Sequence, residues 1–270
     1  MGEYAETGAV RTWYETDGAG EPLVLLHGGF CTNETWGAQR AALAAGFRLF
    51  LPERRAHGHT ADVEGPLRYE DMADDTVAFI DAVVGGPTHL VGWSDGGIVA
   101  LLVALARPDL VRKVVVIGAN FRPAGECWAE PGMIDAMTPD SPDLEFFREL
   151  YDPVAPDGPG HWPVVARKTV DMWRTQPTLT TDDLSRVGAP TLVVVGDDDL
   201  LSLEHTIALH RAIPRSQLAV VPGASHLVPL EKPDTVNRLV IDHLSQDPAP
   251  TMMPIRRAHE EAAASETGSG

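Results

Sequence analysis

A serine stands between glycines in the stretch Gly92-Trp-Ser-Asp-Gly96, where one apolar run ends and a longer one begins. The run at residues 88–91 is short, as a buried strand would be, and the run at 98–106 has the length of a helix. In a sharp strand-to-helix turn a serine hydroxyl is exposed at the edge of the sheet, and glycines two residues before and after leave room for the turn. The spacing predicts that Ser94 is a nucleophile rather than an ordinary turn residue.

The elements that must position this serine alternate along the chain. Short apolar runs predict strands at residues 23–26, 47–51, 88–91, 114–117, 191–195 and 217–221, with an edge strand at 10–15. Helical spacing predicts helices at residues 69–84, 98–106, 204–212 and 233–244. This alternation is typical of an α/β fold with a mostly parallel, doubly wound sheet covered on both faces.

One long segment, residues 121–186, breaks this alternation. It contains no convincing strand and is rich in prolines and aromatic residues, which predicts a helical lid insertion between core segments 1–120 and 187–245. Most of its aromatic side chains are expected to form the lid's own core. The aromatic residues considered are Trp128, Phe146, Phe147, Tyr151, Trp162 and Trp173. Residues 246–270 are rich in Pro, Ala and Glu, which predicts a disordered tail.

Over about residues 8–245 the sequence resembles the α/β-hydrolase fold superfamily, because several motifs occur in that family's order. The stretch His27-Gly-Gly-Phe30 follows a predicted strand, as the family's oxyanion loop does. Residues 53–60 are similar to the family's D-x-R-G-x-G-x-S turn but depart from it at Glu53, Ala56 and Thr60. The resemblance implies that fold, with its cap after the strand at 114–117.

The resemblance also implies a catalytic series in the order serine, acid, histidine. After Ser94, the strand at 191–195 ends in Gly196-Asp-Asp-Asp199, whose third acid matches the family's G-x-x-D. The next strand leads to His226, in a stretch close to the family's histidine loop. We therefore expect His226 to be the general base and Asp199 to orient it. Some members carry the acid after the earlier strand, but residues 118–120 contain none.

An oxyanion hole should complete such a site. Its donors are expected to be the backbone N–H of Asp95 and one from Gly29 or Phe30, a choice that the sequence leaves open. His27 is expected to stabilise its own loop. The remaining histidines lack paired metal-ligand spacing, so we predict neither a metal nor a cofactor.

Within the superfamily, the sequence resembles the valacyclovir hydrolase (biphenyl hydrolase-like) group at residues 92–98, 118–120 and 33–35. This resemblance implies hydrolysis of esters or related carbonyl compounds, and it implies that Asp95 can receive the α-ammonium of an amino-acid ester. Trp93 and Asp95 are accordingly the candidate substrate-binding residues. The alternative is that Asp95 is balanced by the helix dipole or by Arg54 or Arg55.

The leading hypothesis is a serine hydrolase that cleaves a carboxylic ester or lactone of a small molecule through an acyl-enzyme on Ser94. Two alternatives remain. The same residues could serve C–C bond hydrolysis, perhydrolase or haloperoxidase activity, or lyase chemistry, and the scaffold could also be a slow-turnover ligand receptor.

Composition excludes several other classes. The net charge of −18 repels phosphate backbones and anionic lipid, so neither nucleic acid nor a membrane surface is an expected partner. The two cysteines, Cys31 and Cys127, do not suggest a disulfide framework or a zinc site. No secretion signal and no apolar run of about 20 residues is evident, so we expect a cytoplasmic protein. The oligomeric state stays open.

Overall fold

A computed structural model describes residues 2–247 and 252–253 of the chain. None of the helices in this part has the length and apolar character of a membrane span. The predicted disordered tail falls mainly on residues 248–251 and 254–270, which lie outside the described residues.

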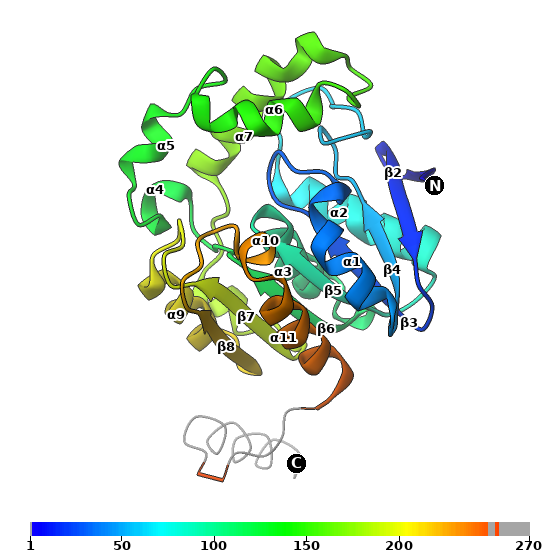
Figure 1. The fold of residues 1–270 in the computed structure, drawn as a ribbon, viewed down its shortest axis with the longest axis vertical. Coiled ribbons are helices and arrows are strands. Elements are labelled where there is room, and N and C mark those ends of the chain that lie inside the picture. Colours follow the sequence, from blue (N-terminus) through cyan, green and yellow to red (C-terminus); the bar gives the residue numbers. More distant parts are fainter. Residues whose placement is uncertain (1, 248–251, 254–270) are drawn as a thin grey trace.

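The centre of the fold is an eight-stranded sheet with the order β1-β2-β4-β3-β5-β6-β7-β8 (Figure 1). The six strands from β4 to β8 in this order run parallel, while β2 pairs antiparallel with both β1 and β4. The bounds are β1 Glu3–Thr7, β2 Val10–Asp17, β3 Glu21–Leu26, β4 Phe47–Pro52, β5 Thr88–Trp93, β6 Val111–Ile117, β7 Thr191–Gly196 and β8 Ser216–Val221. The predicted fold class, a mostly parallel doubly wound sheet, is confirmed.

Helices cover both faces of this sheet, because its central strands are apolar on both sides. Along β6, Val114 and Val116 face one core cluster, which they share with α2 (Tyr69–Phe79), α3 (Asp95–Ala106) and α9 (Leu203–Ala212). Val115 and Ile117 face the other, with α1 (Gly37–Ala44) and α11 (Pro233–Ser245).

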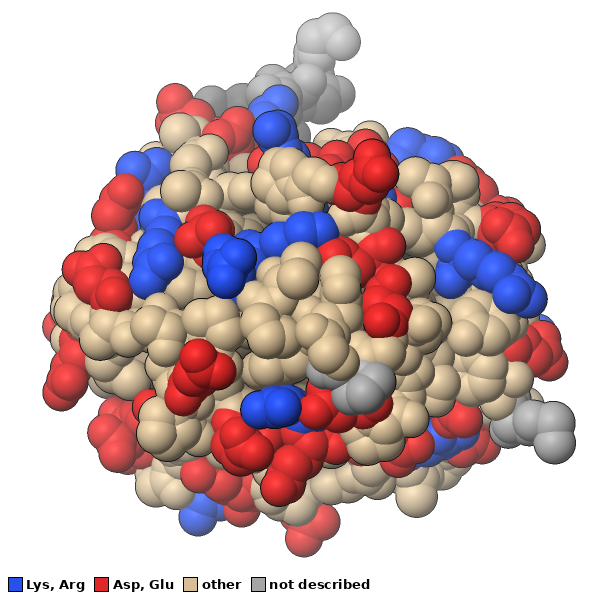
Figure 2. Space-filling view, turned by 90° about the horizontal axis from the view of Figure 1, so that it is seen from above, with Lys and Arg blue, Asp and Glu red and all other residues tan. Residues whose placement is uncertain are grey.

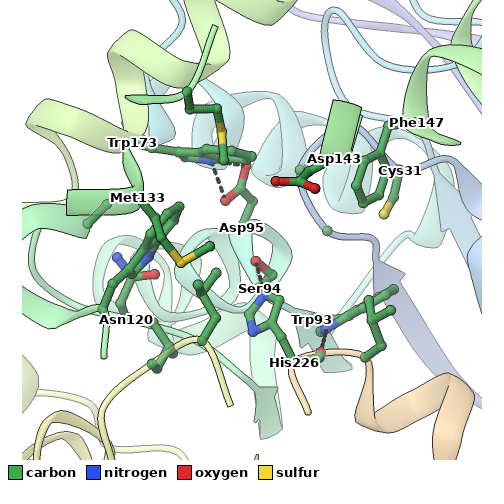
Figure 3. A pocket seen from close by; sticks show the side chains of 18 of the residues that line it. Cys31, Trp93, Ser94, Asp95, Asn120, Met133, Asp143, Phe147, Trp173 and His226 are labelled. Carbon is green, nitrogen blue, oxygen red and sulfur yellow. Dashed lines mark hydrogen bonds between the residues drawn. The ribbon is translucent and has the colours of Figure 1, made fainter. Parts of the chain in front are cut away.

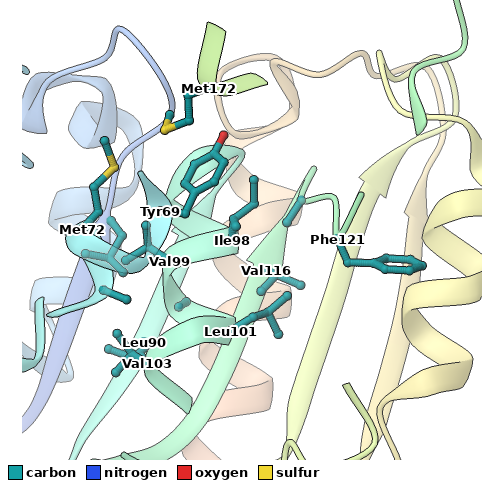
Figure 4. Packing of buried hydrophobic residues seen from close by; sticks show 14 of the residues in the cluster. Tyr69, Met72, Leu90, Ile98, Val99, Leu101, Val103, Val116, Phe121 and Met172 are labelled. Atoms are coloured by element: carbon teal, nitrogen blue, oxygen red, sulfur yellow. The ribbon is translucent and has the colours of Figure 1, made fainter. Parts of the chain in front are cut away.

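The helix α3 lies deepest in the first cluster. Ile98, Val99, Leu101 and Val103 are fully buried there, against Leu90 of β5 and residues of α2 (Figure 4). Burying such a side chain contributes roughly 1.5–3 kcal/mol. The helix that starts beside Ser94 is therefore anchored along most of its length, which fixes the place of the serine.

Outside residues 121–186, the strand β1 and the helices α1 and α10 (Val228–Glu231) were not predicted from the sequence. The strand β1 is short and carries two glutamates, and α1 is short and largely composed of alanine, so neither has a strong apolar period.

Three other predictions need correction. The helix α3 begins at Asp95 rather than Ile98, and β6 begins at Val111 rather than Val114. The strand predicted at the edge, residues 10–15, is β2, which lies inside the sheet because it pairs with both β1 and β4. The helix predicted at 69–84 is confirmed, and its last turn, Ile80–Val84, is π-helical.

Within the described chain, residues 121–186 contain helices but no β-strand, and Trp128 alone forms an isolated β-bridge, with Leu201. The helices are α4 Ala124–Cys127, α5 Gly132–Ala136, α6 Glu145–Tyr151, α7 Trp162–Thr175 and α8 Thr181–Leu184, with short 3₁₀ turns at Pro142–Leu144 and Pro159–His161. Figure 1 shows α4 to α7 gathered above one end of the sheet. Seen from above in Figure 2, basic side chains are scattered among acidic ones and form no continuous basic surface on this face.

The carboxylate of Asp62 ties this segment to the loop that follows β4. It lies 2.8 Å from Nε2 of His161 and 2.7 Å from Nζ of Lys168, and its side chain is only 6% exposed. Lys168 also donates to the carbonyl oxygen of Val63, and the N–H of Asp62 donates to Asp157. This contact joins parts of the chain about a hundred residues apart in sequence.

Replacing Asp62 by Asn is therefore expected to lower the free energy of unfolding by about 1–3 kcal/mol, because Lys168 loses its ionised partner in a nearly buried position. Urea denaturation of the variant and the wild type would measure this difference in the free energy of unfolding. The control is Asp81→Asn, which removes an exposed pair with Arg107 and should cost less than about 1 kcal/mol. Equal effects in the two variants would contradict a structural role for Asp62.

Candidate active site

Ser94 occupies the turn between β5 and α3 with a left-handed backbone, at φ 54°. Its N–H donates to the carbonyl oxygen of Ile117 at 2.8 Å, which ties the turn to β6. A Cβ at Gly92 would come within 2.2 Å of the Gly96 carbonyl oxygen, and one at Gly96 within 2.0 Å of the Leu26 carbonyl oxygen. The two glycines are thus required by the close approach of backbone on either side of the serine.

The structure brings Ser94, His226 and Asp199 together from three separate strand ends. Nε2 of His226 lies 3.0 Å from Oγ of Ser94, and Nδ1 of His226 lies 2.8 Å from Oδ1 of Asp199. Gly118 passes beside this pair, where a Cβ would come within 3.0 Å of Nδ1 of His226. The indole N–H of Trp93 donates to the carbonyl oxygen of His226 at 2.9 Å and so holds the histidine loop.

Asp199 is held as an acceptor for the histidine ring. It is buried, and the N–H of Leu201 donates to the same Oδ1 at 3.0 Å. Burial alone would raise the pKa of Asp199, but the neighbouring His226 and the Leu201 and Gly196 N–H groups bring it below its ordinary value. The other acids of this turn differ, because Asp197 accepts the N–H of Ala224 and is exposed.

Buried polar groups form hydrogen bonds with the loop that follows β3. His27 is fully buried, with Nδ1 2.8 Å from the carbonyl oxygen of Gly28 and Nε2 3.2 Å from the N–H of Arg54. Arg54 donates to the carbonyl oxygens of both His27 and Gly28. The prediction that His27 stabilises its own loop is confirmed, whereas the contribution of Arg54 was not foreseen.

Asp95, the residue after the serine, is buried and already has internal partners. Its Oδ1 accepts the hydroxyl of Tyr69 at 2.8 Å, and the indole N–H of Trp173 lies 3.0 and 3.1 Å from its two oxygens. Burial raises the pKa of Asp95 above its ordinary value, while the charge of Arg54 and the hydrogen bonds from Trp173 and Tyr69 oppose the rise.

Of the two arginines considered as partners for Asp95, only Arg54 acts on it. Arg55 points elsewhere, since its Nε and Nη2 lie 2.7 and 2.8 Å from the two carboxylate oxygens of Asp75. It also lies 3.4 Å from Asp71. Arg55 is thus part of a separate ion pair with α2, and of the two arginines that the sequence offered as alternatives only Arg54 acts on Asp95.

A cavity of about 170 Å³ opens over Ser94 between the sheet edge and the helices of residues 121–186 (Figure 3). An engineered cavity of roughly 150 Å³ holds a benzene molecule, so this one suits a small acyl group. Its walls are mostly apolar. The lining residues are Gly28, Gly29, Cys31, Trp93, Ser94, Asp95, Asn120, Ala124, Trp128, Met133, Met137, Asp143, Leu144, Phe147, Trp173, Leu200, Leu201, His226 and Leu227.

The predicted substrate-binding residues Trp93 and Asp95 both line this cavity, and Gly29 does too, whereas Phe30 packs its ring against Trp162 and Trp173. The six aromatic residues named in the sequence analysis divide into three groups. Trp128, Phe147 and Trp173 line the cavity, Tyr151 and Trp162 are buried core, and Phe146 is exposed. No spacing in the sequence separates these groups, so the lining residues were not foreseen.

A doubly wound sheet with a serine, a histidine and an aspartate hydrogen-bonded in series at its strand ends defines the class of α/β hydrolases. The chain belongs to the alpha/beta hydrolase family, whose model matches residues 23–239. It is a hydrolase. In the described part of the chain, no group of three or more His, Cys, Asp and Glu is placed to hold a metal ion.

Relatives in this family differ in their named reactions. The chain is 29% identical over 248 residues to the human serine hydrolase BPHL, covering 87% of this chain and 83% of that protein. A thermophilic esterase from Thermogutta terrifontis is 28% identical, with a TM-score of 0.73 over 91% of this chain and 98% of that one. A 2-hydroxy-6-oxo-6-phenylhexa-2,4-dienoate hydrolase from Rhodococcus shares the fold, at 20% identity and a TM-score of 0.72, covering 91% and 99%.

Proposed function

We propose that this hydrolase cleaves a carboxylic ester or lactone of a small molecule through an acyl-enzyme on Ser94. The observation that carries the proposal is the pair of contacts at the floor of the cavity, 3.0 Å from Ser94 Oγ to His226 Nε2 and 2.8 Å from His226 Nδ1 to Asp199. An uncharged serine becomes a nucleophile when a base held by a third group is within such reach.

The proposed reaction has two halves. Oγ of Ser94 attacks the ester carbonyl while Nε2 of His226 takes the hydroxyl proton and then returns it to the leaving alcohol. Water then attacks the acyl-enzyme, with His226 taking its proton, and the carboxylic acid and free serine are released. Asp199 holds the proton-bearing Nδ1 of His226 and stabilises the ring when it is charged.

The second oxyanion donor is proposed to be the N–H of Gly29 rather than that of Phe30. The carbonyl of Gly28 and the N–H of Gly29 belong to one planar trans peptide and point in opposite directions. Since the Gly28 oxygen accepts from Arg54 and His27, the Gly29 N–H is turned away from them. Gly29 lines the cavity and Phe30 is not among its lining residues, which also supports this choice. The other donor is the N–H of Asp95, at the start of α3.

Residues 121–186 are proposed to act as a lid, because eight of the nineteen residues that line the cavity over the serine come from this segment. This placement supports a role in specificity. Among the lining residues there are two carboxylates, Asp95 and Asp143, and no lysine or arginine. Such a wall disfavours an anion, so it favours a neutral ester over a dienoate, the substrate that names the Rhodococcus neighbour.

A hydrolysis screen tests the proposal. Purified protein would be given p-nitrophenyl acetate, a lactone, a thioester, an anilide and an aryl dienoate. We expect kcat/KM for the ester or lactone to exceed that for the dienoate by at least about 100-fold. The reverse order would establish C–C chemistry instead. Single turnover without steady release of product would point to the receptor alternative.

A second candidate concerns the substrate cation that Asp95 could receive. The carboxylate lines the cavity, and its Oδ2 accepts only the indole N–H of Trp173 among the described residues. The internal donors Tyr69 and Trp173 leave an ionised carboxylate with room for one more hydrogen bond. We therefore propose that an ester bearing a free ammonium is preferred, though weakly, because the Arg54 charge already acts on Asp95.

We expect an α-amino-acid ester to exceed its N-acetyl analogue in kcat/KM by about 5- to 10-fold, a preference absent from Asp95→Asn. Burial raises the pKa of Asp95, so the carboxylate is ionised above that pKa and the preference is lost as the pH falls through it. This loss should occur at a higher pH than an ordinary aspartate would give. Comparing the two esters within each variant cancels any general effect of the substitution, and equal rates in the wild type would contradict the ammonium site.

A further inference from the structure

Arg54 is a buried cation without a carboxylate hydrogen-bonded to it. Its side chain leads from the loop after β4 into the base of the oxyanion loop and is 4% exposed. Within the described residues, no ion pair includes Arg54, and its Nε has no hydrogen-bond partner. Its two terminal nitrogens donate instead to the carbonyl oxygens of His27 and Gly28. Burial of a charge in such a setting is unfavourable unless other groups offset it.

The hydrogen bonds of Arg54 fix two successive peptide units of the oxyanion loop. The Gly28 oxygen accepts from Nη2 of Arg54 at 3.0 Å, from Nδ1 of His27 at 2.8 Å and from the N–H of Cys31 at 3.3 Å. Since the peptide is planar, whatever holds this oxygen also holds the N–H of Gly29 in the opposite direction. Arg54 therefore determines where the loop's N–H groups face, although it is not itself among the cavity-lining residues.

The positive charge of Arg54 also offsets negative charge at the site. Asp95 puts a buried carboxylate next to the place where negative charge develops, and its partners Tyr69 and Trp173 are neutral donors. Burial raises the pKa of Asp95, and the Arg54 charge is the largest influence opposing that rise. Burial lowers the pKa of Arg54, and the Asp95 charge is the largest influence opposing that fall. The two charges therefore stabilise each other without direct contact.

We propose that Arg54 is a positioning residue for the hydrolytic reaction: its guanidinium holds the peptides of the oxyanion loop, and its charge offsets the Asp95 carboxylate beside the developing oxyanion. The proposal rests on the proposed function, since it assumes acyl transfer at Ser94. It differs from a merely structural role, which would affect stability without changing the rate at a folded site.

The neighbouring Arg55 offers a matched control. It is also buried, at 7% exposure against 4% for Arg54, but it pairs with Asp75, and neither Arg55 nor Asp75 lines the cavity. Arg54→Lys and Arg55→Lys both keep the charge and both lose the planar fork of donors. Only the first of these changes should disturb the oxyanion loop.

The experiment measures kcat and KM for p-nitrophenyl acetate, inhibition by phenylboronic acid and the thermal midpoint. The variants are Arg54→Lys, Arg54→Met, Asp95→Asn, the double variant Arg54→Met/Asp95→Asn, and Arg55→Lys. Folded sites are counted by fluorophosphonate labelling. We expect Arg54→Lys to lower kcat per labelled site by about 10- to 100-fold with little change in KM, and to weaken phenylboronic acid similarly. Arg55→Lys should leave kcat within about twofold of wild type.

The double variant tests the electrostatic part. Removing the carboxylate as well should restore kcat at least about tenfold over Arg54→Met, because no uncompensated negative charge remains beside the oxyanion. If Arg54→Met does not fold, kcat is compared between Arg54→Lys and the double variant Arg54→Lys/Asp95→Asn. Because lysine keeps the positive charge, the added Asp95→Asn change is then expected not to restore kcat. Equal kcat in Arg54→Lys and Arg55→Lys would overturn the positioning role. Absence of wild-type ester hydrolysis with Ser94 unlabelled would instead overturn the proposed function.

Discussion

Replacement of Ser94 by alanine is expected to lower kcat for p-nitrophenyl acetate by about 10⁴- to 10⁶-fold, because serine, base and acid act as a unit and the loss of the nucleophile removes the contribution of all three. Oγ of Ser94 lies 3.0 Å from the proposed base, and no other described side chain shares this contact with His226 Nε2. A fluorophosphonate probe should label Ser94 in the wild type and label nothing in the variant. Steady-state rates and mass spectrometry of the labelled peptide measure both effects.

A serine far from the cavity provides the control for this substitution. Ser185 is exposed in the turn after α8 and donates to the carbonyl oxygen of Asp182, so Ser185→Ala should change kcat by less than about twofold. Label on a serine other than Ser94, or turnover by Ser94→Ala close to that of wild type, would refute the assignment.

The central strands could be predicted from sequence because each is buried on both faces of the sheet and is therefore a continuous apolar run. The run at β5 and the buried helix α3 are the clearest example, since nearly every residue of both is in the core. The strand β1 lies at the edge of the sheet and pairs with β2 alone, so its residues alternate without a strong apolar signal. The strand β8 lies at the opposite edge but could be predicted, because it keeps an apolar run, whereas β1 contains two glutamates.

The proposed catalytic residues could be found because each follows a strand end at a recognisable turn. The surroundings of Asp95 could not, because its partners come from distant elements: Tyr69 is 26 positions away in sequence and Trp173 is 78. No periodicity connects such residues; only the packing of α2 and α7 around the start of α3 brings them together. The same holds for Arg54, whose hydrogen bonds reach back to the end of β3.

Asp199→Asn is expected to lower kcat by about 10⁴-fold, since an amide of the same shape can present its NH₂ to Nδ1 of His226 and so select the wrong tautomer of the ring. Among the described residues, the buried Asp199 is the only hydrogen-bond partner of Nδ1 of His226, at 2.8 Å. The pKa of Asp199 is held below its ordinary value. The wild-type carboxylate is therefore ionised above that lowered pKa, so at neutral pH the comparison is between an ionised carboxylate and a neutral amide.

The neighbouring Asp198 is the matched control, because it carries the same group one position earlier in the same turn but is exposed. Asp198→Asn should leave kcat within about twofold of wild type. If instead Asp198→Asn lost activity and Asp199→Asn kept it, the acid would be misassigned. If both variants kept full activity, His226 would not depend on a carboxylate, and the contact at 2.8 Å would serve only to hold the loop. Loss in Asp199→Asn alone, with an unchanged thermal midpoint, assigns the orienting role to Asp199, because a residue that merely stabilised the fold would change the midpoint before it changed the rate at a folded site.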